Sequence, residues 1–227
     1  MYLKVQNEQE YLNRLFSYYK NLGERKLKLA THPDNRVINP LYSSPEKDVF
    51  RIFDDMQNTR PVAVIIGQDP YPQPNTATGI AFANSGSNDK PLSPSLKVIQ
   101  NSVLSFCGGE FDKTLMLWVM QGIMPINVAW TVQYNQLGSH LLFWTSFTSS
   151  FIHVLSQNFD GICYILLGKV AQQLKPAICS GTILEEYHPS YYVRNDSLMP
   201  ATVWKEMVRY VEDTFDIKLK LTYDKNE

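Results

Sequence analysis

Four short apolar runs divide this chain, and each is bounded by glycine, proline or polar residues that favour turns. The runs cover residues 62–66, 123–128, 161–167 and 182–185, and we predict a strand at each. The first, Val62 to Ile66, is apolar at every position and mostly β-branched, which indicates a strand buried on both faces. Strands of this kind are typical of a parallel sheet that is covered by helices.

Between these runs, apolar residues recur at three- and four-residue spacing, which predicts helices. The expected helices cover residues 1–30, 44–56, 95–107, 115–120, 142–155, 168–171 and 201–214. Residues 187–192 are predicted to form a loop, and the tail over 218–227 is predicted to be loosely held. This order predicts an α/β fold, a three-layer α/β/α sandwich around a mostly parallel four-stranded sheet.

Composition supports a globular protein, because 44% of the 227 residues are hydrophobic and 19% are charged. We expect one domain over residues 1–227. The three cysteines show no paired spacing, so neither a disulfide framework nor a metal site is indicated. The first residues do not resemble a signal peptide, and no apolar run is long enough to span a membrane. We therefore expect a soluble, cytoplasmic protein that has no membrane partner.

Candidate chemistry lies where three of the predicted strands end. Asp69 follows the first strand, Asn127 lies at the end of the second, and His188 comes after the fourth. The carboxyl ends of parallel strands meet at one edge of a sheet, so we expect these three side chains to lie near one another. Taken singly, each has an ordinary explanation as a turn, cap or loop residue. Formal net charge is −1, so DNA binding would need a local basic face.

The run Gly67 to Tyr71, Gly-Gln-Asp-Pro-Tyr, closely resembles the water-activating loop of family 1 uracil-DNA glycosylases. Further pieces match that family in the same order: Gly79 to Phe82, the Pro/Ser loop up to Ser95, Asn127, Gly168 with Lys169, and His188-Pro189-Ser190. The resemblance implies an enzyme that flips a uracil nucleotide out of DNA and hydrolyses its N-glycosidic bond. It implies no metal and no organic cofactor.

By this resemblance, Asp69 and His188 would be the catalytic residues. Asp69 would stabilise the positive charge on the sugar and orient the attacking water, and His188 would donate to O2 of the departing uracil anion. Four residues would hold the base. Phe82 would stack on uracil, Asn127 would recognise its polar edge, Tyr71 would exclude the methyl group of thymine, and Gln68 would help to bind a uracil carbonyl.

The resemblance also implies contacts with DNA, from Pro94, Ser95, Gly168, Lys169, Ser190 and Tyr192. Three positions depart from the family pattern. Pro72 replaces a His that helps to position the water, and Tyr192 replaces a Leu that wedges into the gap left by the flipped base. Lys169 replaces a Ser beside the DNA backbone, where its charge would attract phosphate.

These observations predict a monomeric uracil-DNA glycosylase of base excision repair, with uracil in single- or double-stranded DNA as its substrate. A proteinaceous glycosylase inhibitor is a further candidate partner. Two alternatives stay open at this point. One is a glycosylase for another modified pyrimidine. The other is a DNA- or inhibitor-binding relative with weak or no catalysis, which the replacement of the family His by Pro72 would allow. A generic nucleotide-binding α/β enzyme is a weaker alternative, since the chain has no P-loop and no G-x-G-x-x-G.

Overall fold

A parallel four-stranded sheet forms the centre of the protein. We describe it from a computed structural model, which defines residues 2–31, 48–74, 76–86 and 91–224. The strands are β1 (Ala63–Gly67), β2 (Ile123–Asn127), β3 (Cys163–Leu167) and β4 (Thr182–Glu186), in the spatial order β2-β1-β3-β4. All neighbouring pairs are parallel, so the four predicted strands and the parallel sheet are confirmed.

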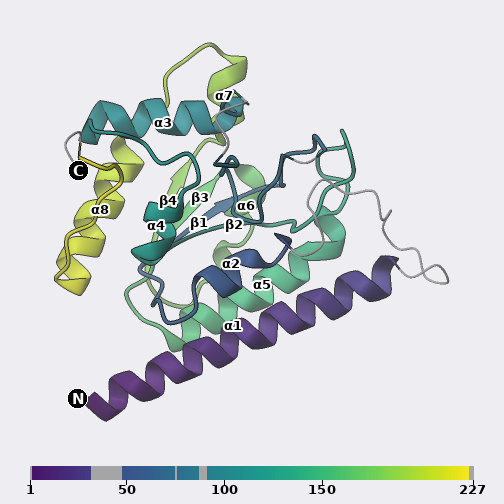
Figure 1. Cartoon of the computed structure of the whole chain (residues 1–227), viewed down its shortest axis with the longest axis vertical. Helices are drawn as coiled ribbons and strands as arrows, with labels where there is room; N and C mark the ends of the chain where they lie inside the picture. The colour runs from purple at the N-terminus through teal and green to yellow at the C-terminus, as the bar shows by residue number, and fades with distance from the viewer. Residues whose placement is uncertain (1, 32–47, 75, 87–90, 225–227) are drawn as a thin grey trace.

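Helices cover both faces of this sheet, as Figure 1 shows. They are α1 (Tyr2–Thr31), α2 (Arg51–Asp55), α3 (Pro94–Cys107), α4 (Met116–Met120), α5 (Leu141–Asn158), α6 (Lys169–Gln172), the 3₁₀ helix η2 (Lys175–Ala177), α7 (Pro189–Arg194) and α8 (Thr202–Phe215). One layer contains α1, α2 and α5, and the other contains α3 and α8 (Figure 1). A helix is found within each predicted range, but the second is shorter than predicted: it covers only Arg51–Asp55, and residues 44–47 of that prediction lie outside the described residues.

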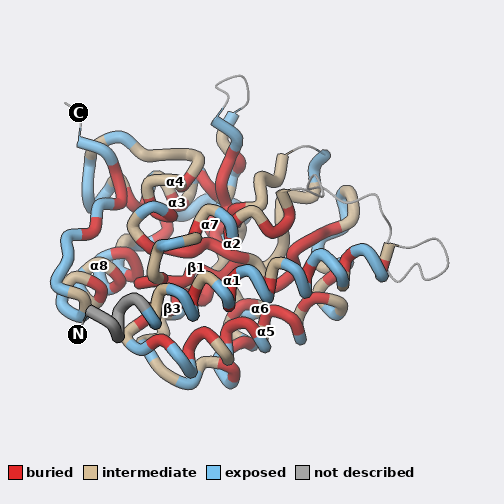
Figure 2. Tube along the Cα trace, turned by 60° about the horizontal axis from the view of Figure 1, so that its bottom comes forward, coloured by how far each residue is buried: buried red, intermediate tan, exposed pale blue. Residues whose placement is uncertain are grey.

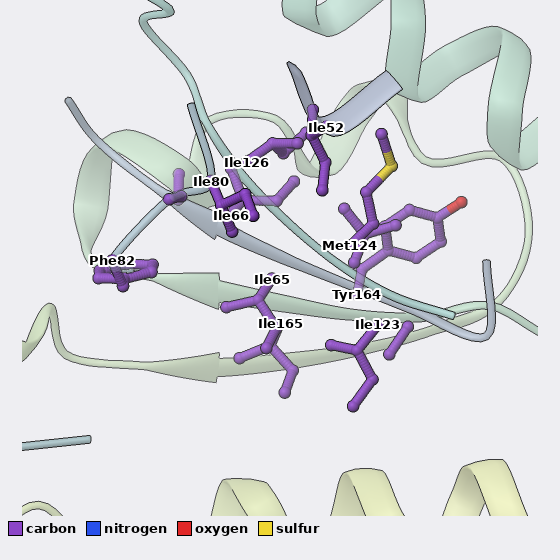
Figure 3. Close-up of a cluster of buried hydrophobic side chains, with 14 of the residues drawn as sticks. Ile52, Ile65, Ile66, Ile80, Phe82, Ile123, Met124, Ile126, Tyr164 and Ile165 are labelled. Carbon is purple, nitrogen blue, oxygen red and sulfur yellow. The ribbon is translucent and has the colours of Figure 1, made fainter. Parts of the chain in front are cut away.

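The core follows from the alternation of side chains along the strands. Even-numbered residues such as Ile66 and Ile126 point to the side of Ile52 in α2, and odd-numbered residues such as Ile65 and Ile165 point to the other side (Figure 3). Residues of both sets are buried. The sheet is therefore apolar on both faces, as the continuous apolar runs in the sequence predict.

Aromatic side chains hold the first helical layer together. The ring of Phe16 in α1 lies 5.9 Å from that of Phe53 in α2 and 6.4 Å from that of Phe151 in α5, centroid to centroid. Figure 2 shows the strands and the inner sides of the helices buried, with the outer turns of α1 exposed. No helix among the described residues combines the length and the apolar character needed to cross a bilayer.

One predicted loop is a helix. Residues 189–194 form α7, although a loop was expected over 187–192. The sequence His188-Pro189-Ser190 begins this helix in a well-understood way: proline occupies the first turn, where no backbone N–H is required, and the His188 side chain accepts from the Ser190 N–H. The loop prediction was wrong because histidine is seldom the side chain that caps a helix.

The tail is also held more firmly than predicted. Leu219 and Leu221 are buried, and the Trp118 indole N–H donates to the Leu221 carbonyl at 3.0 Å. Tyr223 forms a short antiparallel bridge with Glu110, with backbone bonds in both directions. The tail therefore closes the core beside α4 as far as residue 224, and the prediction of a loose segment was wrong over this stretch.

We predict that Leu221→Ala lowers the free energy of unfolding by about 2–5 kcal/mol, because it removes a buried side chain and leaves a cavity. Urea unfolding followed by circular dichroism measures this. Leu198→Ala is the matched control, since Leu198 is 84% exposed and loses the same atoms at the surface. Equal midpoints for both variants would contradict a packed tail.

Candidate active site

The residues that follow the four strands gather at one edge of the sheet. Asp69 lies two residues beyond β1, Asn127 ends β2, Gly168 follows β3, and His188 lies two residues beyond β4. Gly67 and Asn127 are partners in the β1–β2 register. A β-carbon on Gly67 would lie 2.5 Å from Asn127 Oδ1 and 2.6 Å from Phe82 Cζ, so this glycine leaves room for both side chains.

The two carboxylate oxygens of Asp69 differ in their surroundings. Oδ2 accepts from Gln68 Nε2 at 2.7 Å and from the Gly138 backbone N–H at 2.8 Å. Oδ1 is buried and has no hydrogen-bond partner among the described residues. Burial raises the pKa of Asp69 above its ordinary value, although the two bonds to Oδ2 oppose the shift. The result is a fixed carboxylate with one oxygen open to a further donor.

His188 is held in a single tautomer. Its Nδ1 lies 3.2 Å from the Ser190 backbone nitrogen, which donates to it, and 2.9 Å from Ser190 Oγ. Arg194 donates to the same Oγ, so the hydroxyl hydrogen is left to point at Nδ1. Because Nδ1 accepts these bonds, the neutral ring carries its hydrogen on Nε2. Burial, assisted by the charge of Arg194, lowers the pKa of His188 to about 4, so the ring is neutral at physiological pH.

Gly168 brings His188 to the end of β3. Its φ of +88° lies in the left-handed region, and a β-carbon there would meet His188 Cβ at 2.7 Å. The Gly168 N–H also donates to the Glu186 carbonyl at 2.8 Å, which ties the start of α6 to the end of β4. A side chain at position 168 would therefore push His188 away from the site.

Phe82 is held in an unusual backbone conformation beside His188. Its φ is +66°, which is uncommon for a bulky residue and which proteins tend to keep at functional sites. Figure 3 shows its ring beyond the ends of the strands, and the centroid lies 5.9 Å from that of the His188 ring. The Tyr71 hydroxyl donates to the Phe82 carbonyl at 2.5 Å, so Tyr71 helps to hold this conformation. Burial raises the pKa of Tyr71, which stays neutral.

The segment that precedes α5 folds over the Asp69 loop. Besides the bond from Gly138 to Asp69, the Asn135 backbone N–H donates to the Pro72 carbonyl at 3.0 Å. No sequence pattern indicates Gly138, because a backbone donor has no side-chain type that could reveal it. The bond from Gln68 to Asp69 was also not predicted, and it engages the amide nitrogen of a side chain expected to contact uracil.

The residues expected to contact DNA differ in exposure. Pro94 and Lys169, at the starts of α3 and α6, are exposed, and Ser95 is half-buried. Ser190 is half-buried and supports His188. Tyr192 is only 7% exposed, and its hydroxyl donates to Glu186 Oε1 at 2.6 Å. In this structure Tyr192 therefore does not project from the surface, as a wedge between bases would.

Comparisons with known proteins point to one family. The family model described as "Uracil DNA glycosylase superfamily" matches residues 53–212. A uracil-DNA glycosylase from Azobacteroides pseudotrichonymphae is 31% identical over 219 residues, which cover 94% of this chain and 92% of that protein. The crystal structure of mimivirus uracil-DNA glycosylase has a TM-score of 0.70 at 21% identity, and covers 81% of this chain and 75% of that one. A variant of the same mimivirus protein, in which phenylalanine replaces a tyrosine, was solved in complex with UGI. It has a TM-score of 0.71 at 21% identity, over 81% of this chain and 77% of that one.

The burial of Asp69 yields a prediction for stability. Its pKa is raised in the folded protein, so its contribution to stability is present at low pH and is lost as the pH rises through that pKa. We expect Asp69→Asn to raise the Tm at pH 7, because the variant no longer buries a charge; each kcal/mol gained corresponds to about 2–4 °C in a chain of this length. Calorimetry at pH 7 and near pH 4 measures it, and the gain should shrink at the lower pH.

The matched control is Asp213→Asn, which neutralises an exposed carboxylate on α8. It should show no gain at either pH. A lower Tm for Asp69→Asn at pH 7 would mean that its two hydrogen bonds outweigh the burial of its charge.

Proposed function

Because this chain belongs to the uracil-DNA glycosylase superfamily, we propose that Asp69 and His188 are the two groups with which it releases uracil from DNA. The enzyme is a uracil-DNA glycosylase, a hydrolase of DNA repair that cleaves the N-glycosidic bond between uracil and deoxyribose. As this bond breaks, positive charge develops on the sugar and negative charge on the departing base. Each of the two groups acts on one of these charges.

Asp69 acts on the sugar side. The single observation that carries this assignment is the buried Oδ1, which has no partner among the described residues while Oδ2 accepts two donors. Oδ1 accepts a hydrogen from the attacking water, and the carboxylate charge stabilises the sugar cation. Its burial strengthens this electrostatic effect, since few water molecules screen it.

His188 acts on the base. Its Nε2–H is free to donate because Nδ1 already accepts from Ser190. A pKa lowered to about 4 keeps the imidazole neutral, so it stabilises the developing uracil anion as a hydrogen-bond donor and does not protonate the base. Ser190 and Arg194 act on this step through the orientation of the ring.

The base is bound between Phe82 and Asn127. The Phe82 ring stacks on uracil, and the Asn127 amide accepts from N3–H and donates to O4, a pattern that cytosine reverses. Both side chains lie against Gly67, which supports a common pocket. Tyr71 fills the space beside C5, and Gln68 contributes to the binding of a uracil carbonyl besides its bond to Asp69.

Pro72 is compatible with this mechanism. Asp69 is oriented by Gln68 and Gly138, neither of which depends on a side chain at position 72. Position 72 has no imidazole that could help to position the water. Pro72 therefore affects the rate of hydrolysis more than the binding of uracil.

The same proposal covers the DNA contacts, the oligomeric state and the location of the protein. Pro94, Ser95, Gly168, Lys169 and Ser190 border the DNA backbone, and the exposed charge of Lys169 attracts phosphate. The chain acts as one domain, as a monomer and in the cytoplasm. A mimivirus relative was solved in complex with UGI, which supports a proteinaceous inhibitor as a partner here as well.

We predict that Asp69→Asn slows uracil release by about 100- to 10,000-fold, the usual range for loss of a general base, while uracil-DNA affinity changes little. A labelled single-stranded oligonucleotide with one uracil, treated with alkali after incubation, measures the rate. A thymine oligonucleotide is the negative control. An unchanged rate in the variant would remove Asp69 from the mechanism.

A second prediction concerns specificity. Tyr71→Ala should release thymine measurably, because it opens the space that a C5 methyl group needs. Tyr71→Phe is the control: it keeps the ring but loses the bond to the Phe82 carbonyl. It should continue to reject thymine. Thymine release by both variants would assign the selectivity to that hydrogen bond, and release by neither would exclude Tyr71 as the barrier.

A further inference from the structure

Two exposed tyrosines stack on each other beside His188. Tyr187 directly precedes the histidine, and Tyr191 is the third residue of α7. Their ring centroids are 4.4 Å apart and their planes differ by 17°. The residues are 56% and 38% exposed, so the pair is an aromatic surface open to solvent. We call it the tyrosine platform.

The tyrosine platform is supported from within the protein. The ring of Tyr192 lies edge-on to both rings, at interplanar angles of 77° to Tyr187 and 89° to Tyr191. Its hydroxyl donates to Glu186 Oε1 at 2.6 Å, and the same oxygen accepts from the Tyr187 backbone N–H at 2.6 Å. Glu186 thus fixes both the first residue of the platform and the ring beneath it. The exposed rings are held in place before any ligand arrives.

The position of the platform points to the nature of its ligand. It flanks His188, whose ring faces Phe82 in the proposed uracil pocket, so it lies at the border of that pocket. Arg194, one turn after Tyr191 on α7, is exposed and adds positive charge. An aromatic face that shares a short helix with an exposed cation, and that directly adjoins His188 of a proposed nucleobase site, suits a second nucleobase and its phosphate.

We propose that the tyrosine platform stacks on a base of the uracil-containing strand next to the flipped nucleotide. Tyr192 is then a positioning residue, which acts through Glu186 and the two exposed rings. This inference rests on the proposed function and adds a DNA contact to the same site. Stacking on an aromatic ring needs no particular base, so the contact adds affinity without dictating the sequence around uracil.

The experiment measures the affinity of a single-stranded uracil oligonucleotide by fluorescence anisotropy, in an Asp69→Asn background so that the substrate persists. We expect Tyr191→Ala and Tyr187→Ala to bind about 5- to 150-fold more weakly, the loss that one base–aromatic stack produces. Tyr191→Phe and Tyr187→Phe keep the ring and should bind as tightly as the parent. Tyr18→Ala removes a ring that is 60% exposed on α1, and should have no effect because α1 lies on the other side of the sheet from α3, against which α7 packs.

A second arm needs no variant that could misfold. The bases on either side of uracil are replaced in turn by abasic linkers. Loss of the stacked neighbour should weaken binding to the parent, and Tyr191→Ala should lose little more on that oligonucleotide, because the two changes remove one contact. Equal affinity for both abasic oligonucleotides and the intact one, or fully additive losses, would overturn the proposal.

These outcomes are separate from a failure of the proposed function. If the wild-type enzyme with Asp69 intact releases uracil while the alanine variants bind normally, only the tyrosine platform is refuted. Absence of uracil release by the wild type would refute the catalytic assignment of Asp69 and His188 instead.

Discussion

The parallel register of the sheet is the constraint on which the active site depends. Gly67 pairs with Asn127 in the neighbouring strand. Because the glycine has no β-carbon, the Asn127 amide and the Phe82 ring can occupy the space beside it. All four strands run the same way, so Asp69 and His188 reach the same edge as Asn127 although they lie far apart in the sequence. A slip of one residue between β1 and β2 would turn Asn127 to the opposite face and dismantle the site without changing any side chain.

Several features of the site oppose stability locally. Asp69 keeps a buried oxygen that has no partner within the part of the chain that the structure describes, and Phe82 adopts a positive φ that a bulky residue rarely takes. The remainder of the fold offsets these costs, because the sheet is buried on both faces and aromatic rings pack α1, α2 and α5 together. The same burial gives the two proposed catalytic groups opposite shifts: it raises the pKa of Asp69 and lowers that of His188. One is an acceptor and the other a neutral donor, as the two charges of the reaction require.

The sequence predicts the sheet and the residues at its edge, because both have a local signature. Continuous apolar runs mark buried strands, and Asp69, Asn127 and His188 are polar side chains at their ends or within two residues of them. What it could not predict depends on contacts between distant segments. The bond from Gly138 to Asp69 is made by a backbone group that every residue but proline possesses. The Leu221 carbonyl accepts from the indole of Trp118, about a hundred positions earlier, and no periodicity in the tail indicates this contact.

Tyr192 illustrates why a matching position does not guarantee a matching role. The resemblance of the His188-Pro189-Ser190 motif implies a wedge role for it, yet its hydroxyl is bonded to Glu186 and its ring is buried. Freeing the ring would leave the half-buried Glu186 carboxylate with one donor fewer and would expose the ring against which Tyr187 and Tyr191 pack. The exposed aromatic surface of this segment is formed by Tyr187 and Tyr191, which pack on the buried ring of Tyr192. Around α7, the burial of Tyr192 therefore decides which aromatic side chains are left exposed for a ligand.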